Sequence, residues 1–187
     1  MPPKVKISKE DIINKAVELI NNEKVLTASS LSKALNCSTQ PIFWSFDSMD
    51  DVKKQAFDQA HKQFSDFLRL PIENVGPYKA TGIRYIQFAR NNRGLFKFLF
   101  MSERAKEENI LVNDSNLPFL VRLIMNKEPM DEDNAKEICK IMWLFCHGIA
   151  TMIAMNTVDI NETEVDKMLD RVCLGLLGGK GNETIIN

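Results

Sequence analysis

The sequence predicts an all-α fold, and three observations support this prediction. Apolar residues recur every three or four positions through most of the 187 residues, which is the period of a helix with one buried face. No long stretch alternates between apolar and polar residues, as a half-buried strand would. Seven prolines and eight glycines leave long segments without a helix breaker. We therefore expect helices joined by short turns.

The N-terminal part of the chain predicts four helices. The first begins at Ser8, which forms a capping-box pattern with Asp11. Its apolar stripe consists of Ile12, Ile13, Ala16, Val17 and Ile20. Two short helices follow at residues 28–35 and 39–46, and Ser38 in the turn between them can cap the later one. A fourth helix begins at a second capping box, Ser48 with Asp51, and its stripe consists of Val52, Ala56, Ala60, Phe64 and Phe67.

The C-terminal part is also predicted to be helical. Leu70-Pro71 and Gly76-Pro77 mark a junction between two halves. Beyond it, the periodicity predicts helices at residues 78–90, 94–101, 117–126 and 131–156, with a polar loop at 109–116. Asn161 and Glu164 cap a last helix that ends at Gly178-Gly179. Its stripe consists of Val165, Met168, Leu169, Val172, Cys173, Leu176 and Leu177.

Composition and charge exclude several classes of protein. Hydrophobic residues make up 44% of the chain, too many for a disordered protein. The formal net charge is −1, so any surface that binds nucleic acid has to be local. The four cysteines form no CxxC pair and indicate reduced thiols in a cytoplasmic protein. The N-terminal residues lack the apolar run of a signal peptide, and the most apolar run, 141–155, is shorter than the about 20 residues of a membrane span.

No residue pattern indicates an enzyme, a cofactor or a metal site. The sequence contains no nucleophile–base arrangement, phosphate-binding loop or catalytic pair of carboxylates. His147 follows Cys146, but no further ligands stand at metal spacing, so a packed or interfacial histidine is favoured. Cys139 and Cys146 share a helix face, yet they lie in an apolar stretch, whereas a redox sensor needs exposed thiols of low pKa. We expect no catalytic residue, no cofactor, no metal and no membrane partner.

Residues 27–46, TASSLSKALNCSTQPIFWSF, have the pattern of a helix-turn-helix, in which two short helices are joined by a tight turn. Small or apolar residues are required where the helices cross, and the chain has Leu31, Ala34, Leu35 and Ile42. Polar side chains are required at the start of the second helix to reach base edges, and the chain has Ser38, Thr39 and Gln40. The segment therefore indicates a DNA-binding element.

Residues 8–57 resemble the DNA-binding domain of the TetR family of bacterial transcription regulators. The resemblance lies in Thr27, LSKALNCS at 31–38, PIFWSF at 41–46 and DSMDDV at 47–52. A later segment, MWLFCHGIATMIA at 142–154, is similar to a Trp and His-Gly signature in one subgroup of TetR C-terminal domains. The chain departs from the family at three positions, with Phe43 where Tyr is usual, Met49 where Lys is frequent and Asn36 in place of the turn glycine.

The resemblance implies a helix-turn-helix domain over residues 1–57, whose fourth helix continues to about residue 68 as a connector, and a ligand-sensing and dimerising domain over 58–187. It implies a homodimeric repressor that binds a double-stranded DNA operator and is released by a small apolar or amphipathic effector. Residues 1–60 contain eight lysines, eight acidic residues and no arginine, so their basic charge is weak. An alternative is therefore a dimeric ligand- or protein-binding module of this fold with a weakened or lost DNA face, and a redox-sensing regulator is a further one.

The predicted DNA contacts are Lys9, Thr27, Lys33, Ser38, Thr39, Gln40, Phe43 and Trp44. Gln40 either reads an adenine edge in the major groove or is a solvated residue at a helix start. Trp44 follows Phe43 directly, so the two side chains cannot both pack inward. For Trp44 we favour packing against the first or fourth helix over contact with DNA.

The C-terminal part predicts a dimer interface and a ligand pocket. The run 141–155 is apolar nearly all round, which predicts a helix buried on every side with a partner subunit as its cover. The last helix is expected to contribute Val165, Leu169, Val172 and Leu176, although both helices can instead fill a monomer core. The candidate ligand-binding residues are Phe88, Phe119, Met142, Phe145 and Met152. Polar groups that can orient a ligand nearby are Tyr85, Asn92, His147 and Thr151.

Overall fold

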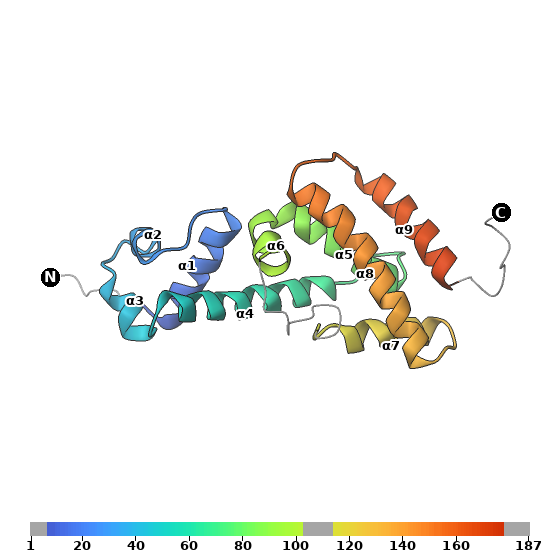
Figure 1. Cartoon of the computed structure of the whole chain (residues 1–187), viewed down its shortest axis with the longest axis horizontal. Coiled ribbons are helices and arrows are strands. Elements are labelled where there is room, and N and C mark those ends of the chain that lie inside the picture. The colour runs from blue at the N-terminus through green and yellow to red at the C-terminus, as the bar shows by residue number, and fades with distance from the viewer. Residues whose placement is uncertain (1–6, 103–113, 178–187) are drawn as a thin grey trace. The chain divides into compact units, whose positions relative to one another are not determined.

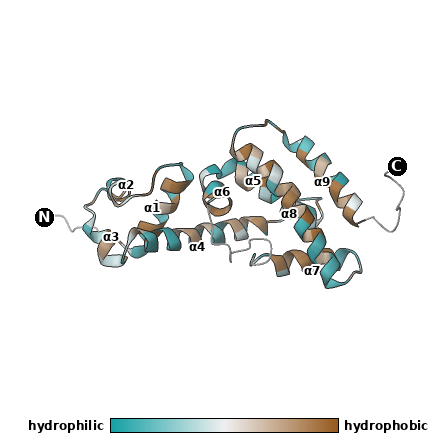
Figure 2. Ribbon diagram, viewed as in Figure 1, coloured by the Kyte–Doolittle hydropathy of each residue, from teal (hydrophilic) through white to brown (hydrophobic). Residues whose placement is uncertain are grey.

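A computed structural model of the chain describes residues 7–102 and 114–177. These residues form nine α-helices and no strand, which confirms the predicted all-α class (Figure 1). The helices are α1 (Lys9–Asn21), α2 (Ala28–Ala34), α3 (Gln40–Ser45), α4 (Met49–Leu68), α5 (Pro77–Asn91), α6 (Arg93–Phe100), α7 (Leu117–Lys127), α8 (Glu132–Ala154) and α9 (Glu162–Leu177). Most of these helices contain both hydrophobic and hydrophilic residues, as expected when each helix buries one face (Figure 2). The predicted stop at Gly178-Gly179 and most of the predicted loop at 109–116 lie outside the described residues.

The chain divides into two compact units that are not consecutive in the sequence. Of the described residues, the first unit contains 7–65 and 91–102, and the second contains 66–90 and 114–177. Helix α6 therefore belongs to the unit of α1, α2 and α3, although it follows the predicted junction at residues 70–77.

Helix α1 begins at the predicted capping box. The backbone N–H of Asp11 donates to the Ser8 hydroxyl at 3.0 Å, and the backbone N–H of Ser8 donates to the Asp11 carboxylate at 2.9 Å. These hydrogen bonds to Ser8 lower the pKa of the Asp11 carboxyl below its ordinary value. All five residues of the predicted stripe are buried, namely Ile12, Ile13, Ala16, Val17 and Ile20. Both the start of the helix and its inward face are therefore confirmed.

Gly94 allows α6 to begin directly against the end of α1. A Cβ atom at this position would lie 2.1 Å from the carbonyl oxygen of Ile20 and 2.6 Å from that of Asn21, closer than atoms can approach. The Lys97 ammonium on α6 forms an ion pair with Glu23 at 2.8 Å, and this contact lowers the pKa of the Glu23 carboxyl. A residue without a side chain is therefore required where these two helices meet.

In the second unit, α5 lies against both α8 and α9 at Gly82. A Cβ atom there would lie 3.2 Å from Leu169 Cδ2 and 3.3 Å from the Cys146 sulfur, so the glycine lets three helices come together. The start of α9 has the predicted cap, because Glu164 N–H donates to the Asn161 side chain at 3.0 Å and Asn161 N–H donates back to Glu164 at 3.2 Å. This local pattern fixes the register of α9 relative to the loop before it.

Helix α8 is long and apolar enough to cross a membrane by length and composition alone. Within its most apolar 18-residue window, 39% of the residues are buried inside the protein. Core helices of soluble proteins satisfy the same criterion, so this property is weak evidence for a membrane span.

Candidate nucleic-acid interface and ligand-sensing unit

Helices α2 and α3 form the predicted pair of short helices joined by a tight turn. Leu31 on α2 and Ile42 on α3 are fully buried, whereas Ala34 and Leu35 are half-buried. Asn36 in the turn has a φ of 52°, in the left-handed region, and asparagine tolerates this conformation better than most residues. The chain thus forms this turn without the glycine that is usual in the TetR family.

The start of α3 differs from the prediction that Ser38 caps it. The N-cap residue is Thr39, whose backbone is helical with φ −72° and ψ −15°, and no side chain accepts a capping hydrogen bond. A capping oxygen reaches the first N–H groups when the N-cap backbone is extended, which it is not here. Ser38, Thr39 and Gln40 are all exposed, so the hydroxyl groups of Ser38 and Thr39 are not engaged in capping α3.

Helix α3 presents two aromatic side chains to solvent. Phe43 is 49% exposed and Trp44 is 79% exposed, so the prediction that Trp44 packs against another helix is wrong. Ile42 on α3 and Phe46, the residue that follows α3, are buried. Trp44 follows Ile42 by two residues, which places it on the opposite side of the helix. Gln40, Phe43 and Trp44 are spaced as neighbours on one helix face, and we call these three residues the α3 outer face.

The lysines of the first unit that the structure describes lie in different surroundings. Lys33 on α2 is exposed, and the Lys9 ammonium lies 4.8 Å from the centre of the Phe46 ring. Lys53 is paired with Asp50 at 3.0 Å. Thr27, another predicted contact, is the N-cap of α2, and its hydroxyl oxygen accepts the N–H of Ser30 at 3.0 Å. Its observed role is therefore to start α2.

A stripe of exposed apolar side chains runs along α8. Its members are 40–50% exposed, and we call them the α8 outer stripe: Ile141, Leu144, Met152 and Met155. With Gly148 between them, their spacing of three and four residues places them on one helix face. The single protomer thus leaves one face of residues 141–155 exposed, and the expected cover by a partner subunit stays a prediction. Helix α8 therefore has an apolar face that the other described helices of its own unit do not cover.

Two of the four predicted interface residues of α9 lie inside the protomer. Val165 and Leu169 are 3% and 0% exposed, so they are core residues of the second unit and cannot face a partner. Val172 and Leu176 are half-buried. The strongest apolar stripe of a helix packs first against the helix's own unit, and Val165 and Leu169 belong to that stripe.

The predicted ligand-binding residues differ in burial. Phe88 and Met142 are buried, Phe119 and Phe145 are half-buried, and Met152 lies on the α8 outer stripe. The guanidinium of Arg69 lies 5.0 Å from the centre of the Phe119 ring. Met152 therefore faces away from the core that contains Phe88 and Met142.

The second unit does contain a polar cluster within its apolar interior. The Tyr85 hydroxyl and His147 Nδ1 are 3.0 Å apart and share a hydrogen bond, and the Trp143 ring stacks on the His147 ring at 4.5 Å. Burial raises the pKa of Tyr85 and lowers that of His147, so both side chains are neutral at pH 7. The buried Trp143 Nε1 and Thr151 Oγ1 atoms have no hydrogen-bond partner among the residues that the structure describes. A ligand with acceptor groups would satisfy them.

Two of the predicted polar residues, Tyr85 and His147, are thus brought together. Asn92 is not, because it lies in the first unit, where its side chain accepts a hydrogen bond from Asn21 at 3.4 Å. From the sequence, Trp143 is recognised only as part of the Trp and His-Gly signature and not as one of the polar groups that can orient a ligand. Its spacing of four residues from His147 and eight from Thr151, on one face of an apolar helix, is the signal that identifies it.

The four cysteines are all reduced, and three of them are buried. Burial raises the pKa of Cys139 to about 11 and that of Cys146 to about 12, and it also raises that of Cys173. Cys37, in the turn between α2 and α3, is half-buried. Buried thiols with raised pKa values react slowly, which disfavours the redox-sensing alternative for these three residues.

The chain matches no protein-family model, and no curated protein is significantly similar to it.

Proposed function

We propose that this protein is a DNA-binding transcription regulator of the TetR type, which acts as a homodimer and responds to a small ligand in its second unit. The observation that carries the proposal is the α3 outer face. A short helix that leaves Phe43 and Trp44 in water, beside the polar side chains of Ser38, Thr39 and Gln40, has a surface suited to a partner.

The chemistry of this face fits the major groove of DNA. The groove admits one helix, and the residues at the start of that helix contact the base edges. Gln40 offers an amide to the paired acceptor and donor of adenine, and the exposed aromatic rings offer apolar contact to thymine methyl groups. Lys9 and Lys33 are available for phosphate contacts.

The α8 outer stripe supports a dimer. Four apolar side chains on one face, each 40–50% exposed, are costly to leave in water and suit a self-complementary interface. A single α3 of six residues reads few base pairs. Two copies, placed about 34–36 Å apart in successive major grooves, read two half-sites related by two-fold symmetry.

The cluster of Tyr85, Trp143 and His147 supports ligand sensing. An uncharged amphipathic ligand suits neutral polar groups inside an apolar unit, where two atoms that can form hydrogen bonds have no partner among the described residues. Ligand binding that favours one arrangement of the dimer over another changes affinity for DNA, with a coupling that is typically about 1–3 kcal/mol.

The experiment is selection from a random DNA library at low salt, followed by fluorescence anisotropy with the enriched sequence. We expect a palindromic motif, with affinity that falls as salt rises. Trp44→Ala is the matched variant, because removing a side chain that is 79% exposed leaves the fold intact by circular dichroism while weakening binding. If folded wild-type protein enriches no motif, the proposal fails.

A second candidate is a dimeric ligand- or protein-binding module that no longer binds DNA. The specific observation in its favour is the balance of eight lysines and eight acidic residues in the first 60 positions, with no arginine. The same selection separates the two candidates, since this module would retain the dimer and the ligand site but enrich no DNA.

A further inference from the structure

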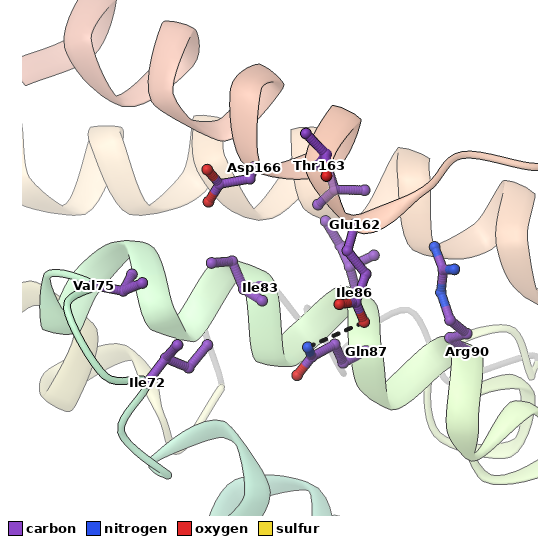
Figure 3. A pocket seen from close by; sticks show the side chains of 10 residues that line it. Ile72, Val75, Ile83, Ile86, Gln87, Arg90, Glu162, Thr163 and Asp166 are labelled. Atoms are coloured by element: carbon purple, nitrogen blue, oxygen red, sulfur yellow. Dashed lines mark hydrogen bonds between the residues drawn. The ribbon is translucent and has the colours of Figure 1, made fainter.

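A cavity of about 310 Å³ lies in the second unit between α5, α9 and the loop of residues 69–76 that precedes α5 (Figure 3). Its apolar wall consists of branched aliphatic residues, Ile72, Val75, Ile83, Ile86 and Val165. The cavity is separate from the cluster of Tyr85, Trp143 and His147, none of which lines it. Its volume is at the lower end of the range found for small-molecule sites.

The loop that forms one wall is held in place by Arg84. The guanidinium of Arg84 donates to the carbonyl oxygen of Pro71 at 2.9 Å and to that of Leu70 at 3.3 Å, and it lies 5.3 Å from the centre of the Phe67 ring. These contacts fix the backbone just before Ile72. The wall is therefore formed before any ligand arrives, so less conformational entropy of the loop is lost when a ligand binds.

The polar end of the cavity is also organised. Arg84 donates to the Gln87 side-chain oxygen at 3.0 Å, which orients the Gln87 amide nitrogen to donate to Glu162 at 3.5 Å. Figure 3 shows this Gln87–Glu162 contact beside Arg90. Arg90 donates to the carbonyl oxygen of Ile160. A guanidinium has five N–H donors, and among the described residues this carbonyl is its one hydrogen-bond partner, so donors remain for a ligand.

The charges around the cavity select the ligand's head group. Asp166 already has a cationic partner, because the Lys79 ammonium lies 2.7 Å from Asp166 and 2.6 Å from Asp170 and is shared by the two carboxylates. Arg90 and Glu162 remain at the polar end and carry opposite charges. An anionic head would be attracted by Arg90 and repelled by Glu162, and the reverse holds for a cationic head. A primary amide meets both, since its oxygen accepts from Arg90 and its nitrogen donates to Glu162.

We propose that this cavity binds a small branched aliphatic molecule that ends in an uncharged amide. The aliphatic part lies against the isoleucine and valine side chains, and the amide lies between Arg90 and Glu162. This site is independent of DNA binding, and its test uses no DNA.

The test is a titration of the full-length protein, labelled at the isoleucine δ-methyl groups, by NMR. The probe is 4-methylpentanamide, and 4-methylpentanoate and 4-methylpentylamine carry the same tail with a negative or a positive head. We expect saturable shifts of the Ile72, Ile83 and Ile86 methyl signals with the amide, and binding at least about tenfold weaker for the two charged probes. No saturable shift with the amide, or equal binding of a charged probe, overturns the proposal.

Glu162→Gln tests the polar end separately. Glu162 is exposed, so the variant keeps its fold, and the polar end of the cavity then loses the carboxylate that accompanies Arg90. We expect the preference to shift from the amide toward the carboxylate. Glu137→Gln, an exposed glutamate on α8, is the control and leaves the order of the three probes unchanged. If Glu162→Gln also leaves that order unchanged, Glu162 does not contact the head group and the proposal fails.

Discussion

Gln40 stands exposed at the start of α3, beside Pro41 and one turn before Trp44. If it reads a base, Gln40→Ala relaxes the preference at one base pair in each half-site, at a cost of about 1–3 kcal/mol of binding free energy. The measurement is anisotropy with operators altered at single positions. Lys33→Ala is the control, since loss of a phosphate contact weakens binding to all sequences alike. If Gln40→Ala weakens binding to all sequences alike, Gln40 contacts the DNA backbone and does not read a base.

His147 makes the stability of the second unit depend on pH. Burial lowers its pKa in the folded protein below the ordinary histidine value of 6.5. Above pH 6.5 the imidazole is neutral in both states, so it adds no pH dependence. As pH falls below that value, the unfolded chain takes up the proton first, so the free energy of unfolding decreases until pH reaches the folded pKa.

We therefore expect His147→Gln to lose less stability than the wild type when the pH is lowered from about 7 to about 5, measured by urea unfolding. An equal decrease in the wild type and in His147→Gln would mean that His147 is not the group responsible.

At the scale of elements, the contact between α1 and α6 depends on Gly94. Gly94→Ala would push the two helices apart, because its Cβ would lie 2.1 Å from a backbone oxygen that cannot move alone. We expect a loss of about 1–3 kcal/mol in the free energy of unfolding, measured in urea. Gly175→Ala on α9 is the matched control, since nothing lies within 4 Å of its Cβ, and it should be neutral or stabilise by up to about 1 kcal/mol. Equal effects of the two substitutions would contradict this explanation.

Helix starts that depend on neighbouring residues were predictable from the sequence. Ser8 with Asp11, and Asn161 with Glu164, form reciprocal bonds within three residues, so the local pattern is sufficient. The cap of α3 was not predictable from the sequence, because it depends on the backbone angles of Thr39, which the residue type does not determine.

Features that depend on distant partners were predicted less well. The sequence predicts that Trp44 packs inward and that Leu169 faces a second subunit, and the structure shows neither. An apolar side chain indicates burial, but it does not indicate which surface buries it. The cavity lined by Ile72 and Ile83 brings together a loop, α5 and α9, and no short motif marks such a combination. The α2–α3 segment was recognisable because turn, crossing residues and exposed polar start all lie within 20 positions.

At the scale of the whole molecule, the α8 outer stripe predicts the oligomeric state. Leu144 is 50% exposed in the protomer, so Leu144→Glu costs the folded protomer little but places a charge in the apolar interface of a dimer. We expect a dimeric wild type and a monomeric, folded Leu144→Glu variant in sedimentation velocity at micromolar concentration, together with loss of DNA binding.

Met125→Glu on α7 is the matched control, because Met125 is 40% exposed and lies outside the stripe, and this variant should remain dimeric. A monomeric wild type, or a dimeric Leu144→Glu variant, would contradict an interface at this stripe.

The unequal burial of the four thiols has a practical consequence. Maleimide reagents attack the thiolate, so near neutral pH they should modify Cys37 and spare Cys139, Cys146 and Cys173, whose pKa values are raised by burial. Mass spectrometry of the conjugate should show one added label, on the peptide that contains Cys37. A fluorophore attached there would stand in the turn between α2 and α3 without any engineered cysteine, where its emission can report the approach of a DNA duplex.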